Sequence, residues 1–250
     1  MYKEIIEKLT CASVTKKNLL EKSIFRYLVA AALAGFFIGM GILIMAQSIL
    51  IFKDISFPIV KFVNGFVFSL ALSYVIFAGG ELFTGNVLVM SMAGFNKRID
   101  VNSLLKVFIF SYVGNLLGAF VISILYSSTN INSDLQSIII SMAEAKINQD
   151  FITLLFKGIM CNILVCLAVL ICNRNIQDIA KLIMIFWCIF PFVALGFEHS
   201  VANMTCFTLA KIFNPSINIM SISNNLIPVT IGNIIGGLLV SLTYYTIGRE

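Results

Sequence analysis

Long apolar stretches separated by short charged segments dominate the chain. The first runs from Tyr27 to Phe52 without a charged residue. A helix needs about 20 residues to cross the hydrocarbon core of a bilayer. Further stretches of about that length or longer lie at 61–97, interrupted by Glu81, at 107–127, at 151–172 with Lys157 near its start, and at 181–211, and a last one ends at Ile247. The pattern predicts six membrane-spanning helices.

Two of these stretches are too long for one straight span, and each carries a polar interruption. The segments are GGELFTGN (79–86) and GFEHSVAN (196–203). Glycine can end one half-helix, and Thr84 or Ser200 can cap the next one. Irregular backbone at this depth is tolerated only where it is buried in protein or faces a water-filled cavity. We therefore expect helices 2 and 5 to be broken.

The two halves of the sequence resemble each other. YVGNLLGAFVISILY (112–126) aligns without a gap on TIGNIIGGLLVSLTY (230–244), and the two interruptions align at nearly the same offset. With three spans in each half, the second half must start from the opposite side of the membrane. The predicted fold is a single all-α transmembrane domain over 1–250, with six helices in two inverted repeats, 27–127 and 151–247.

Composition agrees with a membrane protein, since 59% of the 250 residues are hydrophobic, 12% are charged and the mean hydropathy is +0.99. Five of the 17 Lys and Arg fall outside when both termini are cytoplasmic, namely Lys53, Lys61, Lys146, Lys157 and Lys211. This distribution fits the positive-inside rule. The net charge of +5 therefore reflects topology, and nucleic acid is not an expected partner.

Residues 1–26 are polar and lead directly into a full-length span, which argues against a cleavable signal peptide. Ile5, Ile6 and Leu9 recur at helical spacing among charged residues. They predict a short amphipathic helix on the cytoplasmic surface, with a passive anchor at the membrane favoured over a gate.

The interruptions also contain the residues that could bind a substrate. Two restarted helices would aim their positive N-terminal ends at the bilayer centre, which suits a small anion. His199 can donate a hydrogen bond there and, because imidazole titrates near neutral pH, can carry or lend a proton. Glu81 and Glu198 are expected to accept the backbone N–H groups that each break frees, and thus to structure the loops together with Asn86 and Asn203.

Three motifs make the chain resemble the formate/nitrite transporter family, which includes hydrosulfide channels: GGELFTGN, GIMCNILVCLA and ALGFEHSVANM, in order along nearly the whole chain. The resemblance implies an aquaporin-like inverted repeat and a homopentamer with one path through each protomer. It also assigns the residues of the path. His199 matches the central histidine, Thr84 its partner, Asn162 an asparagine beside them and Lys146 an outer-vestibule lysine. The implied constrictions are an inner one of Leu72, Phe68 and Val165 and an outer one of Phe83 and Phe192.

The resulting hypothesis is a channel or transporter for small monovalent weak-acid anions (hydrosulfide, formate, nitrite) in the cytoplasmic membrane of a prokaryote. Lys146 and the helix ends would draw in the anion, which would meet His199 and cross the constrictions largely as the neutral acid, since a bare charge is costly to desolvate. Protons, the anion and the lipid bilayer are the expected partners, and no cofactor or metal is expected.

Three alternatives remain. An aquaporin-like channel for neutral solutes would need an Asn-Pro-Ala-like cap in each half, but only Asn214-Pro215-Ser216 is present. A membrane enzyme would have one histidine and six scattered cysteines, which form a poor set of metal ligands. A passive subunit of a larger complex would not explain two matched polar interruptions.

Overall fold

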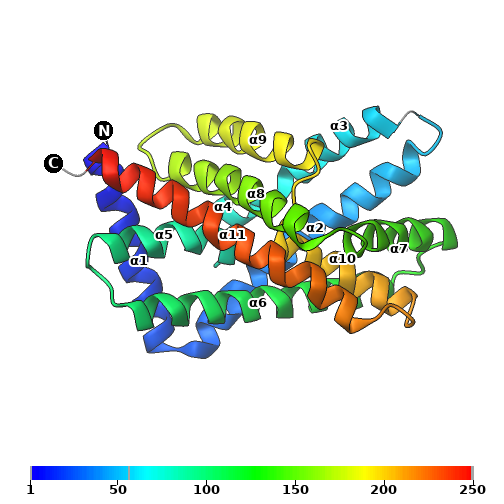
Figure 1. Cartoon of the computed structure of the whole chain (residues 1–250), viewed down its shortest axis with the longest axis horizontal. Coiled ribbons are helices and arrows are strands. Elements are labelled where there is room, and N and C mark those ends of the chain that lie inside the picture. Colours follow the sequence, from blue (N-terminus) through cyan, green and yellow to red (C-terminus); the bar gives the residue numbers. More distant parts are fainter. Residues whose placement is uncertain (1, 56, 249–250) are drawn as a thin grey trace.

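The computed structural model describes residues 2–55 and 57–248, and every regular element in those ranges is a helix. The helices are α1 (Tyr2–Lys22), α2 (Ile24–Ile51), α3 (Phe57–Phe68), α4 (Leu70–Phe77), α5 (Phe83–Phe95), α6 (Val101–Ser127), α7 (Ser133–Ile147), α8 (Phe151–Cys172), α9 (Asp178–Ala194), α10 (Ser200–Phe213) and α11 (Ile219–Gly248). In Figure 1 the long helices run along the molecule, whereas α1 crosses one end, where both termini lie.

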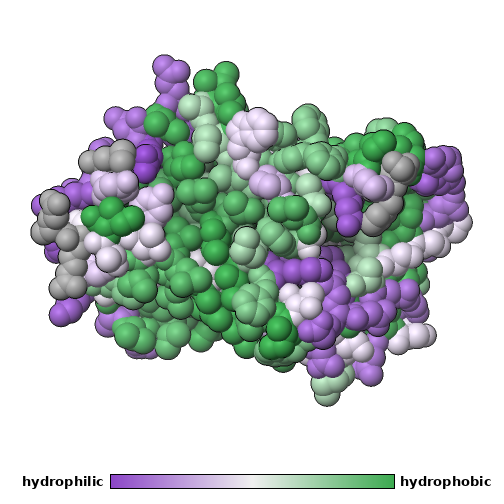
Figure 2. Space-filling view, turned by 45° about the horizontal axis from the view of Figure 1, so that its top comes forward, coloured by the Kyte–Doolittle hydropathy of each residue, from purple (hydrophilic) through white to green (hydrophobic). Residues whose placement is uncertain are grey.

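Within the described ranges, five helical segments are long and apolar enough to cross a bilayer: Ile24–Ile51, Pro58–Phe77, Val101–Ser127, Phe151–Cys172 and Ile219–Gly248. The fifth predicted stretch, 181–211, is divided between α9 and α10, so neither part alone has the length of a span. Hydrophobic residues cover the middle of the face seen in Figure 2, and hydrophilic residues gather toward its two ends. This distribution is typical of a protein embedded in a bilayer.

Helix ends fall at both polar interruptions. The chain leaves the helical path after Phe77 and after Ala194, and Gly79 and Gly196 adopt φ values of 85° and 73°. Nothing lies within 4 Å of a Cβ built on either glycine, so the backbone conformation, rather than lack of space, requires glycine. The predicted caps were one or two residues too late. The N-cap residues are Leu82 and His199, which leaves Thr84 and Ser200 in the first helical turns.

The loop at 128–150 contains a helix that the hydrophobic pattern did not predict, α7. Its N-cap Asn132 accepts a hydrogen bond from the backbone N–H of Leu135, and Leu135 and Ile139 are buried. The carboxyl groups of Asp100 and Asp150 cap α6 and α8 in the same way. Hydrogen bonds from the backbone N–H and hydroxyl of Ser103 hold the pKa of Asp100 below its ordinary value.

The N-terminal helix is longer than predicted and does not use its apolar face to anchor in lipid. Ile5, Ile6 and Leu9 are buried against residues of α5, α8 and α11 that include Met92 and Leu170. The anchor interpretation is therefore wrong for these side chains, because they pack against protein. Helix α1 is part of the helical bundle.

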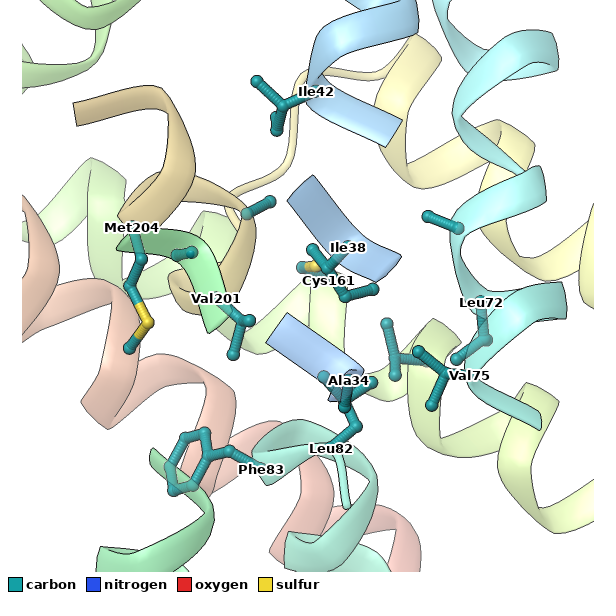
Figure 3. Packing of buried hydrophobic residues seen from close by; sticks show 14 of the residues in the cluster. Ala34, Ile38, Ile42, Leu72, Val75, Leu82, Phe83, Cys161, Val201 and Met204 are labelled. Carbon is teal, nitrogen blue, oxygen red and sulfur yellow. The ribbon is translucent and has the colours of Figure 1, made fainter. Parts of the chain in front are cut away.

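Small residues bring the long helices together in two pairs, α2 with α6 and α8 with α11. A Cβ on Gly118 would clash with the carbonyl oxygen of Ala32, and one on Gly236 would clash with that of Ile159. Backbone contact of this kind is the usual way in which helices associate inside a membrane. Helix α2 contributes to the shared core: in Figure 3 its side chain Ile38 lies between Leu72 of α4 and Val201 of α10.

We expect Gly118→Ala to destabilise the protein by about 1–3 kcal/mol, because α6 can accept the methyl group only by moving away from α2. The measurement is the midpoint of thermal unfolding in detergent. Gly94→Ala is the matched control, since its Cβ would only touch the end of the Leu104 side chain at 3.4 Å. Equal midpoints for the two variants would contradict the close-packing explanation.

Candidate functional site

The two interruptions meet at one hydrogen bond. Thr84 lies in the first turn of α5 and His199 caps α10, and Thr84 Oγ1 lies 2.9 Å from His199 Nε2. The two side chains are 0% and 3% exposed. Since α5 and α10 both begin here, the positive ends of two helix dipoles converge on this contact.

The position of His199 determines which nitrogen carries the proton. Its Nδ1 accepts a hydrogen bond from the backbone N–H of Ala202 at 3.1 Å, so Nδ1 is unprotonated. A neutral imidazole then carries its proton on Nε2, which donates to Thr84 Oγ1. A doubly protonated ring would lose the cap of α10 and would place a positive charge between two positive helix ends. The geometry therefore holds His199 as a neutral hydrogen-bond donor.

Two asparagines satisfy the backbone of the interruptions. Asn115 of α6 accepts from the N–H of Phe83 at 2.9 Å and donates to the carbonyl oxygens of Ala31 and Glu81. Asn233 of α11 does the same in the other half. It accepts from the N–H of Ser200 at 2.9 Å and donates to the carbonyl oxygens of Gly158 and Glu198. Each asparagine thus connects a loop to two neighbouring helices.

The expected role of the glutamates needs correction, because these asparagines receive the backbone N–H groups. The Glu198 carboxylate instead accepts from Lys146 Nζ at 2.9 and 3.0 Å and from Asn203 Nδ2 at 2.7 Å. Glu198 and Lys146 are mostly buried, with side chains 4% and 18% exposed. Asn225 extends the network, since it donates to the carbonyl oxygen of Lys146 and accepts from Asn203.

Glu81 has matching partners in the first half. Its carboxylate accepts from Lys16 Nζ at 2.8 and 2.9 Å, from Tyr27 Oη at 3.1 Å and from Asn86 Nδ2 at 3.0 Å. Lys16 belongs to α1 and Lys146 to α7. A lysine from a helix outside the apolar spans therefore neutralises the glutamate of each loop.

Two cavities approach the Thr84–His199 contact. The α7-side cavity, of about 130 Å³, is lined by Ile42, Met45, Lys61, Asn64, Phe68, Lys146, Phe192, Val193, Gly196, Phe197, Glu198, His199, Ala202 and Asn203. The α1-side cavity, of about 540 Å³, is lined by residues of α1, α4, α5, α8 and α9 and of the first loop, among them Lys16, Leu72, Glu81, Leu82, Asp178 and Lys181. Thr84 lines neither cavity; its neighbours Leu82 and Gly85 line one, and its partner His199 lines the other.

The apolar side chains are grouped differently from the expected constrictions. Phe68 was expected with Leu72, but it lines the α7-side cavity and packs edge-on against Phe192, with ring centroids 5.8 Å apart. Leu72 lines the α1-side cavity instead. Phe83 was expected with Phe192, but it packs against aromatic rings of α6, including Tyr112 at 5.0 Å. For Phe68 and Leu72 the reason is a helix boundary: Phe68 ends α3 and Leu72 belongs to α4, so their four-residue spacing does not place them on one face of a continuous helix.

Two further predicted residues lie close to the contact or in the surrounding core. Asn162 Nδ2 donates to the carbonyl oxygens of Thr84, at 3.3 Å, and Asn233. Its Oδ1 is buried and has no hydrogen-bond partner among the described residues. These contacts fix the orientation of the amide and leave its acceptor atom available. Val165 is buried in the core and lines neither cavity.

Sequence reasoning missed Asn115, Asn233, Lys16 and Tyr27. Both asparagines stand at matching positions of the aligned segments 112–126 and 230–244, whose similarity served only to identify the repeat. An asparagine that recurs inside a predicted span, where polar groups are costly, is the signal that could have identified them.

The chain is similar in sequence and in structure to proteins of one known family. The sequence model of the family described as "Formate/nitrite transporter" matches residues 3–247. The nitrite transporter NirC of Escherichia coli (strain K12) is 34% identical over 95% of this chain and 88% of its own length. A solved structure described as an FNT family ion channel superposes with a TM-score of 0.90 at 31% identity, covering 97% of this chain and 98% of that one. A pentameric formate channel with formate bound superposes with a TM-score of 0.80 at 28% identity, covering 92% and 99%.

We expect Lys146→Met to destabilise the fold by about 3–5 kcal/mol, because it leaves the buried carboxylate of Glu198 without its cation. The double variant Lys146→Met/Glu198→Gln should recover much of this loss. The readout is the unfolding midpoint in detergent. Lys53→Met is the control, since Lys53 and Asp134 form an exposed pair at 3.4 Å whose loss costs at most about 1 kcal/mol. A Lys146 variant as stable as the Lys53 variant would contradict the structural role of the buried pair.

Proposed function

The chain belongs to the formate/nitrite transporter family, and on that premise we propose that it is a membrane channel for small monovalent weak-acid anions such as formate, nitrite and hydrosulfide. The names of its relatives support the first two substrates, since they include a nitrite transporter and a formate channel. Hydrosulfide has similar size and the same charge, and we include it in the proposed substrate class.

The hydrogen bond between Thr84 and His199 is the observation that carries the proposal. It lies between two cavities and at the start of two helices, where the dipoles favour a negative guest. A passing guest would exchange this hydrogen bond for its own contacts with the imidazole N–H and the threonine hydroxyl. Both halves of the chain contribute to such a site, as expected for a path along the interface of two repeats.

We propose that the guest crosses the apolar collar mainly as the neutral acid. Phe68 and Phe192 on one side, and Leu72 and Leu82 on the other, offer no polar group to replace the hydration of an anion. Asn162 Oδ1 can accept the acidic O–H or S–H of the protonated form. We assign the proton to water in the cavities rather than to His199, because a charged His199 would lose its capping bond.

The assembly and topology complete the proposal. We propose a homopentamer in the cytoplasmic membrane of a prokaryote, with one path in each protomer, six membrane-crossing segments in two inverted repeats, and both termini in the cytoplasm. The pentameric formate channel that superposes on this chain supports the assembly. The matching partners of Glu81 and Glu198, and of Asn115 and Asn233, support the repeat.

We expect His199→Asn to lower the flux of formate or nitrite about tenfold at every pH, because it removes one buried hydrogen bond to the guest, worth about 1.4 kcal/mol. Asparagine is a good helix cap, so α10 should remain intact. Flux should still rise as pH falls, following the protonated fraction of the substrate. The measurement is uptake into proteoliposomes at several pH values, together with the unfolding midpoint of the variant.

Thr84→Ser keeps the hydroxyl and serves as the control, whereas Thr84→Val removes it and should resemble His199→Asn. Unchanged flux in both His199→Asn and Thr84→Val would exclude the contact from the path. A pH dependence that disappears in His199→Asn would instead assign the proton to the imidazole.

A further inference from the structure

One buried side chain of the α7-side cavity has a hydrogen-bonding end that the path described so far does not use. Asn64 of α3 lines this cavity and is 8% exposed. Its Oδ1 accepts a hydrogen bond from Ser48 Oγ of α2 at 2.5 Å. The oxygen and the nitrogen of an amide point in different directions, so this contact turns Nδ2 away from Ser48.

The nitrogen of this amide faces the cavity as an unused donor. Among the described residues, Nδ2 of Asn64 has no hydrogen-bond partner, and it is not one of the unpartnered atoms that the protein encloses. Since Asn64 lines the cavity, the open side of Nδ2 is the cavity itself. A donor that is held in place by a contact at the other end of its amide is ready for a guest with an acceptor atom.

Lys146 supplies a second donor to the same cavity. An ammonium group has three N–H donors, and the contacts with the Glu198 carboxylate, at 2.9 and 3.0 Å, use two of them. Within the described part of the chain the third makes no hydrogen bond, so it is available to a guest. Asn64 belongs to α3 and Lys146 to α7, so the two donors stand on different helices of the cavity wall.

The cavity is small enough for one guest to reach both donors. Its volume of about 130 Å³ is well below the roughly 300–1,000 Å³ of pockets for drug-sized ligands. Asn64 stands one helical turn before Phe68, which packs edge-on against Phe192 in the same wall. A guest between the two donors is therefore next to the apolar collar and has not yet crossed it.

Two donors on different helices favour an anion with two oxygen acceptors. Formate and nitrite are bent anions with two terminal oxygens each, and they can accept from Asn64 and Lys146 at the same time. Hydrosulfide has a single sulfur, which is a weak hydrogen-bond acceptor. A site built to hydrogen-bond one substrate discriminates against an analogue that lacks the matching atoms.

We propose that Asn64 is a specificity-determining residue: its Nδ2, together with one N–H of Lys146, forms a loading site that holds formate or nitrite before the apolar collar. The inference rests on the proposed function and states which members of its substrate class the α7-side cavity binds best. Hydrosulfide follows the same path without being held at this site. Ser48 is a positioning residue, because it acts only through the orientation of the Asn64 amide.

The test measures the uptake of formate and of hydrosulfide into proteoliposomes of the full chain over a range of concentrations. For Asn64→Leu we expect the half-saturating formate concentration to rise about tenfold, as for the loss of one hydrogen bond to an anion, and that of hydrosulfide to change less than about twofold. The maximal rate for formate should not fall, because the collar is unchanged. Ser48→Ala keeps Nδ2 but frees the amide, so we expect about a two- to fivefold rise for formate alone.

Asn102→Leu is the matched control, because it makes the same change at an exposed position of α6 that does not line this cavity. The inference is overturned if Asn64→Leu behaves like Asn102→Leu, or if it shifts formate and hydrosulfide equally. A lower half-saturating formate concentration in Asn64→Leu would also overturn it, because Oδ1 would then face the cavity. Should Asn64→Leu fail to fold in detergent, an unchanged formate response of Ser48→Ala overturns the inference instead.

The wild-type protein separates this inference from the proposed function. Proteoliposomes of the wild type that carry neither formate, nitrite nor hydrosulfide would remove the proposed function, and this inference with it. Normal wild-type flux with the same ratio of formate to hydrosulfide affinity in Asn64→Leu would remove the inference alone.

Discussion

Every backbone polar group in a bilayer must find its partner inside the protein, and the rest of this structure depends on how two interrupted helices meet that requirement. Asn115 and Asn233 supply partners for backbone groups at the two breaks. Each gives one acceptor and two donor contacts to a loop and to the helices beside it. Because the loops are satisfied in this way, their other side chains are available for chemistry. The contact between Thr84 and His199 lies where these two loops meet.

Ionic contacts of Glu81 and Glu198 also stabilise these two loops. Each glutamate is bound to an asparagine on the helix that follows it and to a lysine from outside the apolar spans. Buried charge in such a position is tolerated when it is paired and hydrogen-bonded. These contacts also tie α1 and α7 to the rest of the fold, because each helix supplies the cation for one break.

The sequence was most informative where one physical property of a residue type determines the local structure. Long apolar runs predicted the spans, and glycine within each polar interruption predicted the position of both breaks, because Gly79 and Gly196 adopt a backbone conformation that other residues avoid. The resemblance of the motifs indicated the pair of Thr84 and His199.

The sequence was least informative where the outcome depends on distant contacts. The ion pair between Lys16 and Glu81 joins residues 65 positions apart, and no local sequence pattern predicts it. The grouping of Phe68 with Phe192 rather than with Leu72 depends on the exact rotation of each helix at its break. Helix α7 was missed because its 15 residues are too few to cross a bilayer, and the hydrophobic pattern assigned only stretches of spanning length. Such features require the packed structure, since helical periodicity constrains only neighbours along one element.

The position of Lys16 has a consequence for how the protein can be shortened. Lys16 is one of two cations that line the α1-side cavity, beside Glu81 and Asp178. A chain that began at α2 would keep both acids and only Lys181, which would give this mouth a net negative charge and expose the buried faces of α5 and α11. The N-terminal helix therefore helps to set the electrostatic character of this cavity.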